Sequence, residues 1–238
     1  MSQQIGFAVA GEIATLTLQR PEAGNRLSNE MAASVVAALR QAEGSRLLLL
    51  RGAGTDFCLG RDMQPPPPGA RVSPLDVMRE DAGPMIEMFD AFRHFQPPVV
   101  GVIQGRAWGI GTVFAGICDV TFAAAGSTFR LAELERGIPP CIAMSPLLDR
   151  MPKKALAHLV LSAEEMSAEA ALVAGLISRV VAADQLDAAV QAFVERLLTF
   201  RPEAVAAVKQ YLDSAPHFNE ANAALYGGNL LSNILASR

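Results

Sequence analysis

One stretch, residues 99–133, constrains the fold of this chain more than any other. It opens with a short apolar run, breaks at Gly105, Gly109 and Gly111, continues apolar to Cys118 and enters a second apolar run. This pattern predicts a strand, a glycine-rich turn, a helix and a second strand. Glycines at such a junction allow a tight turn, and the first N–H groups of the helix stay unpaired, where the helix dipole favours negative charge. The stretch therefore predicts a backbone site for an anion.

A carboxylate, Glu133, ends the same stretch. A backbone anion site and a separate acid/base group can together act on a carbonyl compound. A glutamate near the end of a strand is more often solvated or ion-paired, and Arg130 or Arg136 could pair with this one. Glu135 is a second candidate, although it would face elsewhere in an extended or helical segment.

The rest of the chain alternates strand and helix patterns. Strand patterns occupy a hairpin at 5–19, then 46–51 and 176–181, and helix patterns occupy 29–39, 74–95, 162–173, 184–199, 202–212 and 219–235. Ser28 is a good N-cap residue for the first helix, and either Ser162 or Ser167 could cap the helix that ends at residue 173. Alternating elements predict an α/β fold with a sheet that is at least partly parallel. The proline run 65–68 predicts either a surface loop or a mobile wall beside a binding site.

Composition excludes several classes of protein. Hydrophobic residues make up 51% of the chain and charged residues 18%, so a large core can form. The net charge of −4 argues against a nucleic-acid binder. The three cysteines are scattered, which predicts a reducing compartment with neither disulfides nor a metal site. Without a signal peptide pattern or an apolar run of membrane-spanning length, we expect a soluble, cytoplasmic protein that binds no membrane.

Five motifs carry a resemblance to a known family. They are RPEAGNRLS (20–28), FCLGRDM (57–63), QGRAWGIG (104–111), CDVTFAAAGSTFRLAE (118–133) and MSAEAALVAGLISRVV (166–181). In this order and spacing they resemble the crotonase superfamily, the enoyl-CoA hydratase/isomerase family. The resemblance implies a spiral of β-β-α units over residues 1–183. It also implies a C-terminal helical region, 184–238, through which subunits form a homotrimer or a hexamer made of two trimers.

The resemblance also implies a site for an acyl-CoA thioester. Two backbone N–H groups would bind the thioester oxygen as it becomes an enolate anion, and they fall at Leu59 and Ile110. Ile110 stands where the family usually has glycine. Because a β-branched residue does not easily adopt a positive φ, we expect an ordinary helix-start conformation there. Gly60 and Gly109 are implied to line the bound substrate.

Three charged residues are implied to bind the coenzyme A part of the substrate. Asp62 matches a position beside the adenine-ribose group, and Arg26 and Arg61 could supply positive charge for the phosphates. Asp119 resembles a structural residue at the start of a strand, and Lys209 could reach a phosphate. The sequence GIGTVF lacks the third glycine of a dinucleotide-binding fingerprint. We therefore expect no cofactor other than the coenzyme A that is part of the substrate, and no metal.

The acid/base positions indicate which reaction is catalysed. Hydratases of the family use two glutamates to hold and activate water; one falls at Val113 here and the other at Glu133. A single carboxylate can still move a proton between two carbons, so the sequence predicts an enoyl-CoA isomerase of fatty acid metabolism with Glu133 as its base. Another crotonase reaction on an unusual acyl-CoA, such as hydration, decarboxylation or C–C cleavage by a lyase, remains open. A non-catalytic acyl-CoA-binding relative remains open too.

Overall fold

The computed structural model describes residues 4–63 and 71–237. Its strands are β1 (Ile5–Ala10), β2 (Ile13–Leu18), β3 (Leu47–Gly52), β4 (Val99–Ile103), β5 (Arg106–Trp108), β6 (Val120–Ala124), β7 (Thr128–Arg130), β8 (Met166–Ser167) and β9 (Arg179–Val181). The longer helices are α1 (Asn29–Ala42), α3 (Gly83–His94), α4 (Ile110–Ile117), α6 (Lys153–Ser162), α7 (Ala168–Val173), α8 (Leu186–Leu198), α9 (Pro202–Ser214) and α10 (Glu220–Ala236). The proline run 65–68, with its two interpretations, lies outside the described residues.

Short helical segments connect these elements. They are η1 (Pro21–Ala23), α2 (Pro74–Asp76), the π-helix η2 (Val77–Ala82), η3 (Glu133–Arg136), α5 (Cys141–Met144), η4 (Ser145–Leu147), η5 (Ala183–Gln185) and η6 (Ala215–His217). Across residues 4–63 and 71–237, none of the helices combines the length and the apolar character that crossing a membrane requires.

The strands form two sheets, which confirms the predicted α/β spiral. The large sheet has the order β1-β2-β3-β4-β6-β9 and the small one β5-β7-β8. The β1–β2 hairpin is antiparallel, and from β2 to β9 every neighbouring pair of the large sheet is parallel. Two turns of the spiral place one strand in the large sheet and the next in the small sheet, namely β4 with β5 and β6 with β7. This repeat brings the segments that follow β3, β4 and β6 to one end of the molecule.

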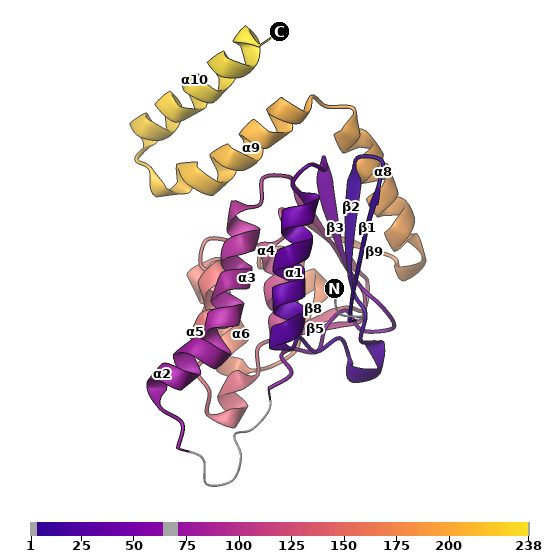
Figure 1. Cartoon of the computed structure of the whole chain (residues 1–238), viewed down its shortest axis with the longest axis vertical. Helices are drawn as coiled ribbons and strands as arrows, with labels where there is room; N and C mark the ends of the chain where they lie inside the picture. Colours follow the sequence, from indigo (N-terminus) through magenta and orange to yellow (C-terminus); the bar gives the residue numbers. More distant parts are fainter. Residues whose placement is uncertain (1–3, 64–70, 238) are drawn as a thin grey trace.

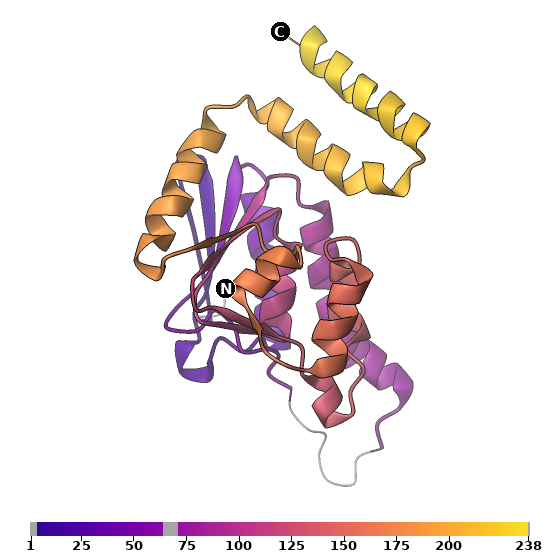
Figure 2. The same ribbon diagram turned by 180° about the vertical axis from the view of Figure 1, so that it is seen from behind.

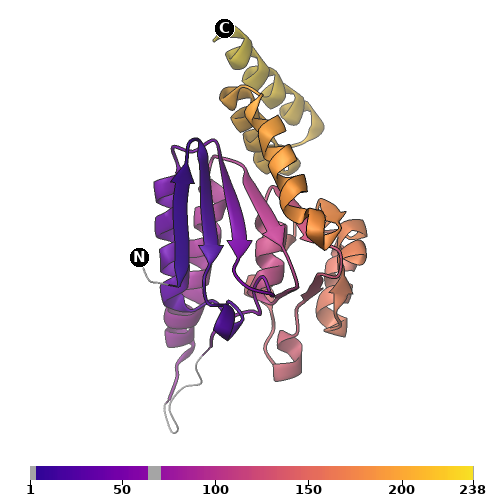
Figure 3. The ribbon, with the colours of Figure 1, turned by 90° about the vertical axis from the view of Figure 1, so that its right-hand side faces the viewer.

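Both faces of the large sheet are covered. All of β4 is buried: Val99 and Ile103 belong to the main core, with α1, α3 and α4, while Val100 and Val102 belong to a second core with α8. Alternation of side chains along the strand explains the division. Helices α1 and α3 lie side by side on one face (Figure 1), and α8 lies on the opposite face (Figure 3).

The expected cap of the first helix is confirmed. Ser28 accepts a hydrogen bond from the N–H of Met31 at 3.1 Å and caps α1. Of the two caps expected for the helix that ends at Val173, Ser167 is confirmed and Ser162 is wrong. Ala163 ends α6 with φ +53°, Ser167 pairs with β7, and α7 begins at Ala168 with Ser167 as its cap. A cap-like sequence there belongs to the end of one helix and a short strand.

The C-terminal region divides differently from the expected boundary between residues 183 and 184. Helix α8 packs on the large sheet and so belongs to the body. Only α9 and α10 extend beyond it, as an antiparallel pair (Figures 1 and 2). Of the side chains that the structure describes on these two helices, none is buried.

One partly buried ion pair ties α9 to the body. The Lys209 ammonium donates to Asp119 Oδ2 at 2.8 Å and to the Pro97 carbonyl at 3.0 Å, and the two charged side chains are only 10% and 19% exposed. Asp119 Oδ2 also accepts the N–H of Val99 at 2.7 Å. Lys209 is thus engaged within its own chain rather than free to reach a phosphate, and Asp119 has the expected structural role.

Replacing Lys209 with Met is expected to lower the free energy of unfolding by about 3 kcal/mol, because it leaves the Asp119 carboxylate partly buried without its counter-ion. Urea denaturation followed by circular dichroism measures the change. Lys153→Met, at an exposed position on α6, is the matched control and should change stability by less than about 0.5 kcal/mol. Equal effects of the two substitutions would contradict the structural role of Lys209.

Candidate active site

Residues 58–62 form an extended segment between two others. On one side, the Cys58 N–H donates to the Arg106 carbonyl at 3.2 Å, and the Trp108 N–H donates to the Cys58 carbonyl at 2.8 Å. On the other side, Leu27 donates to the Gly60 carbonyl and Asp62 donates to the Leu27 carbonyl, both at 2.9 Å. The segment therefore connects the end of β5 to the loop that follows η1.

Two glycines bring this segment against the turn before α4. Gly60 has φ +104° and Gly109 has φ +53°. A Cβ atom on Gly109 would lie 3.0 Å from the Cα atom of Gly60 and 3.5 Å from Oε1 of Glu133. These distances show that the three residues, predicted from three separate motifs, lie together.

Glu133 begins η3, shortly after the end of β7. Its Oε2 atom is buried without a hydrogen-bond partner among the described residues. Arg130, considered from the sequence as a partner for Glu133, instead pairs with Glu135 at 2.5 Å. Arg130 also donates to the Ala163 carbonyl at 2.7 Å, which holds its guanidinium on that side. The carboxylate of Glu133 is therefore available to a bound molecule.

Ile110 has the predicted conformation. It is the first residue of α4, with Gly109 as the N-cap. Ile110 is not among the described non-glycine residues with positive φ, so the positive φ falls on Gly109 and the isoleucine is unstrained. The N–H of a first helical residue has no acceptor within its helix. This N–H is thus an available donor next to Gly109.

The expected donor role of Leu59 is wrong. Its N–H already donates to the Gly24 carbonyl at 2.8 Å, so it could bind an oxyanion only by breaking that bond. The Arg61 N–H, in contrast, donates to no acceptor in the part of the chain that the structure describes. Because Arg61 pairs with Leu27 in a parallel bridge whose bonds use the neighbouring residues, the N–H of Arg61 points away from Leu27.

The charged residues expected near coenzyme A surround the same segment. Arg26 is exposed and donates to the Leu59 carbonyl at 2.8 Å. The Arg61 guanidinium donates to Asn29 at 2.7 Å, and its buried Nε atom has no partner among the described residues. Burial lowers the pKa of Arg61, opposed by the nearby Asp81 carboxylate. Asp62 forms an ion pair with Arg20 at 2.9 Å.

Val113, at the position implied for the second glutamate of a hydratase, is apolar and inaccessible to solvent. Val113 is fully buried in the main core, and its N–H donates to the Gly109 carbonyl at 3.2 Å. Cys58, also fully buried, is no substitute acid or base, because burial raises the pKa of its thiol to about 12. Among the described residues near this turn, Glu133 thus remains the one candidate for proton transfer.

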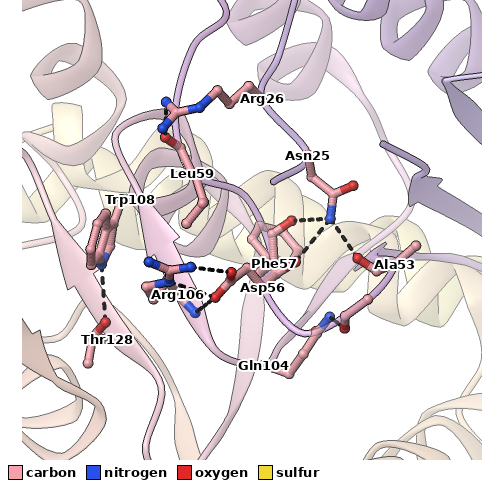
Figure 4. Close-up of polar contacts among 11 residues, drawn as sticks. Asn25, Arg26, Ala53, Asp56, Phe57, Leu59, Gln104, Arg106, Trp108 and Thr128 are labelled. Atoms are coloured by element: carbon pink, nitrogen blue, oxygen red, sulfur yellow. Dashed lines mark hydrogen bonds and ion pairs between the residues drawn. The ribbon is translucent and has the colours of Figure 1, made fainter. Parts of the chain in front are cut away.

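Several residues that position this site are not among the predicted catalytic or binding residues. The loop from Ala53 to Phe57 is held by Asn25 and by an ion pair between Asp56 and Arg106 (Figure 4). The Trp108 ring lies 5.1 Å from the Arg106 guanidinium, and its Nε1–H donates to Thr128 at 3.1 Å. The one signal in the sequence that could have indicated this loop contact is the pair Gly24-Asn25, because both residue types are common in turns.

The Asp56–Arg106 pair predicts a pH-dependent stability. Arg106 contacts both carboxylate oxygens of Asp56, at 2.9 and 2.7 Å, and so lowers the pKa of Asp56. The pair therefore stabilises the fold above the ordinary Asp pKa of about 4 and loses this contribution as pH falls through the lowered value. Asp56→Asn should melt below wild type at about pH 7, and the difference should shrink toward about pH 3. Thermal unfolding across this range checks it; a pH-independent difference would contradict it.

Comparisons with known proteins show which family this chain resembles. Residues 9–233 match the model of the family described as enoyl-CoA hydratase/isomerase. The (E)-benzylidenesuccinyl-CoA hydratase of Thauera aromatica is 31% identical over 211 residues, covering 87% of this chain and 80% of that protein. The 1,2-epoxyphenylacetyl-CoA isomerase of Escherichia coli K12 is 32% identical over 212 residues, covering 85% of this chain and 79% of that protein.

Solved structures show the same fold. An enoyl-CoA hydratase from Mycobacterium smegmatis superimposes with a TM-score of 0.90 at 24% identity, covering 98% of this chain and 91% of that one. A structure of a Thermobifida fusca protein, described as a putative enoyl-CoA hydratase in complex with CoA, has a TM-score of 0.88 at 24% identity, with 98% and 93% coverage. With its fold, its motifs and a family match over nearly its whole length, the chain belongs to the enoyl-CoA hydratase/isomerase family.

Proposed function

We propose that this protein is an enoyl-CoA double-bond isomerase that uses Glu133 as its single base. The observation that carries the proposal is the carboxylate of Glu133 beside Gly109, whose buried Oε2 atom has no hydrogen-bond partner within the described part of the chain, with Val113 where a hydratase has its second carboxylate. A buried polar atom without a partner is unfavourable, so this oxygen is suited to meet a substrate.

The proposed reaction balances with one carboxylate. Glu133 removes a proton from C2 of a 3-enoyl-CoA, and the electron pair of the broken C–H bond delocalises toward the thioester oxygen. The N–H groups of Ile110 and Arg61 stabilise the negative charge that develops on this oxygen. Glu133 then returns the proton to C4, and the product is the 2-enoyl-CoA. The atoms of substrate and product are the same, so we propose that neither a metal nor a separate cofactor takes part.

The relatives support an acyl-CoA substrate but leave the reaction open, because an isomerase and a hydratase match this chain about equally well. Val113 favours isomerisation. Hydration requires an enzyme to hold a water molecule and to move its proton, and a buried valine can do neither. We also propose that Arg26, Arg61 and Asp62 contact the coenzyme A moiety, at the rim of the 58–62 segment.

An assay with two substrates tests the proposal. The purified protein is incubated with a 3-enoyl-CoA and, separately, with the matching 2-enoyl-CoA, and the absorbance of the conjugated thioester is followed. Isomerisation raises the absorbance with the first substrate, and hydration lowers it with the second. Hydration as fast as isomerisation would contradict the role given to Val113. Binding of coenzyme A without turnover of either thioester would show a non-catalytic relative.

We further propose that the chain assembles as a homotrimer, or as a hexamer of two trimers, through α9 and α10. These helices expose large apolar side chains, among them Val208, Leu212, Leu225 and Leu231. An apolar hollow of about 360 Å³ lies between the two helices. Exposed apolar surface of this extent is typical of an interface. Size-exclusion chromatography with light scattering measures the molecular mass of the assembly. The mass of a monomer would contradict the proposed trimer or hexamer.

A further inference from the structure

One buried amide connects the two segments that form the site. Asn25 is fully buried, and its Oδ1 atom accepts the N–H of Arg20 at 2.8 Å. Its Nδ2 group donates to the carbonyls of Ala53, Asp56 and Phe57, at 2.8, 2.9 and 3.1 Å (Figure 4). One side chain thus forms hydrogen bonds with three carbonyl groups of a loop that contains neither helix nor strand.

The loop that Asn25 binds leads directly into the segment 58–62, which contains the N–H group of Arg61. Residues 53–57 follow β3 and continue into residues 58–62. The Cys58 thiol also contacts the Asn25 carbonyl at 3.2 Å, and the Gly24 carbonyl accepts the N–H of Leu59. Asn25 and its neighbour therefore contact this stretch on both sides of Cys58. A shift of the loop would move the N–H of Arg61 relative to that of Ile110.

The chemistry of this position selects asparagine. The side chain must accept one hydrogen bond and donate at the other end, which an amide does and a carboxylate or an ammonium group does not. The backbone has φ +52°, a left-handed conformation that asparagine tolerates better than most other residues with a side chain. Both requirements converge on the same residue.

We infer that Asn25 is a positioning residue for the oxyanion site, holding the Arg61 N–H in register with the Ile110 N–H. This inference rests on the proposed isomerase reaction. Asn25 touches no reacting atom; it acts through the 53–58 loop. Displacing a catalytic donor by about 1 Å can cost about 10²-fold in rate, and losing a donor costs about 10²- to 10³-fold. A defect at Asn25 should therefore appear in the chemical step more than in substrate binding.

Two variants test this. Asn25→Gly removes the amide and accepts the positive φ, and Asn25→Asp keeps the shape but replaces the donor with an oxygen. We expect kcat to fall about 10²-fold in both, with KM and the affinity for coenzyme A changed less than about threefold. The matched control is Ser28→Ala, which removes the two hydrogen bonds of the neighbouring Ser28 hydroxyl, from the Met31 N–H and to Gln4 Oε1, and should keep wild-type kcat.

A spectroscopic measurement separates positioning from general damage. The carbonyl stretch of a bound, ¹³C-labelled 2-enoyl-CoA reports hydrogen bonding to the thioester oxygen. We expect a shift to lower frequency on wild type and on Ser28→Ala, and a smaller shift on both Asn25 variants. Wild-type kcat and carbonyl shift in a folded Asn25 variant would overturn the inference. So would failure of both variants to fold, since Asn25 would then act on the whole fold.

The test also separates this inference from the proposed function. Exchange of the C2 protons of a saturated acyl-CoA with deuterium oxide requires only a base and the oxyanion site. If wild type exchanges no protons and isomerises no substrate, the proposed function fails, and the inference falls with it. If wild type exchanges protons and folded Asn25 variants exchange them equally fast, only the inference about Asn25 is overturned.

Discussion

Replacing Glu133 with Gln is expected to lower kcat for isomerisation by about 10³-fold, because the amide cannot accept the proton that must leave C2. The substitution is nearly isosteric, and the charge it removes has no ion-pair partner among the described residues, so the fold should remain intact. Two measurements check this: the rate of conversion of a 3-enoyl-CoA, and deuterium exchange at C2 of a saturated acyl-CoA. Both rates should fall together, while coenzyme A binding stays near that of wild type.

The chain offers a close control for this variant. Glu135 lies two residues further along η3, and its carboxylate forms an ion pair with Arg130. Glu135→Gln should therefore keep activity within about threefold of wild type, because a partly exposed ion pair contributes little. If Glu135→Gln lost as much activity as Glu133→Gln, the single-base mechanism would be wrong.

The second large effect is expected at Gly109. Its backbone, at φ +53° and ψ −118°, is strained for any residue with a side chain. A methyl group there would lie 3.0 Å from the Cα atom of Gly60, closer than an ordinary contact, and would stand beside Oε1 of Glu133. Gly109→Ala should therefore push the two loops apart, move the Ile110 N–H and fill part of the space for the thioester. We expect kcat/KM to fall at least about 10²-fold.

Gly126 provides the control for backbone strain alone. It also has a positive φ, +89°, but a Cβ atom there would meet nothing within 4 Å. Gly126→Ala should cost about 1 kcal/mol of stability, through its backbone, and leave turnover unchanged. Comparing melting temperature and kcat/KM for both variants separates the two causes. Equal activity of the Gly109 and Gly126 variants would place the thioester away from Gly109.

The large elements of the fold were predictable because their signals are local. The hydrophobic run of β4, the Ser28 cap of α1 and the break at Gly109 before α4 each depend on residues within a few positions. For the same reason, local signals could not decide whether Ser162 or Ser167 caps the helix that ends at Val173. The capping pattern there is real as sequence, but a strand pairing of Met166 and Ser167 with β7 decides where α7 begins.

The candidate site also contains residues that local patterns predicted and a donor that only long-range contacts decide. Glu133, Gly60 and Gly109 were predicted from motifs, and the structure brings these three together. Leu59 was predicted as a donor too, but whether its N–H is free depends on Gly24, which lies 35 residues earlier in the chain. No local pattern reveals which backbone donors a distant carbonyl will occupy.

The sequence by itself determined the family, the strand and the helix at the two ends of residues 99–117, and a single carboxylate where a hydratase has two, since these depend on residue identity and short-range order. It did not reveal β5, which lies inside the predicted turn, because β5 forms through its pairing with the distant β7. The tertiary structure decided which N–H groups remain free, and it showed that Arg130 pairs with Glu135, which leaves Glu133 without a partner in residues 4–63 and 71–237. It also disclosed Asn25 as the link between two loops. The physical reason is that a backbone N–H or a charged side chain has few places for partners. The fold decides which group comes close enough to occupy them, and that group can lie far away in the sequence.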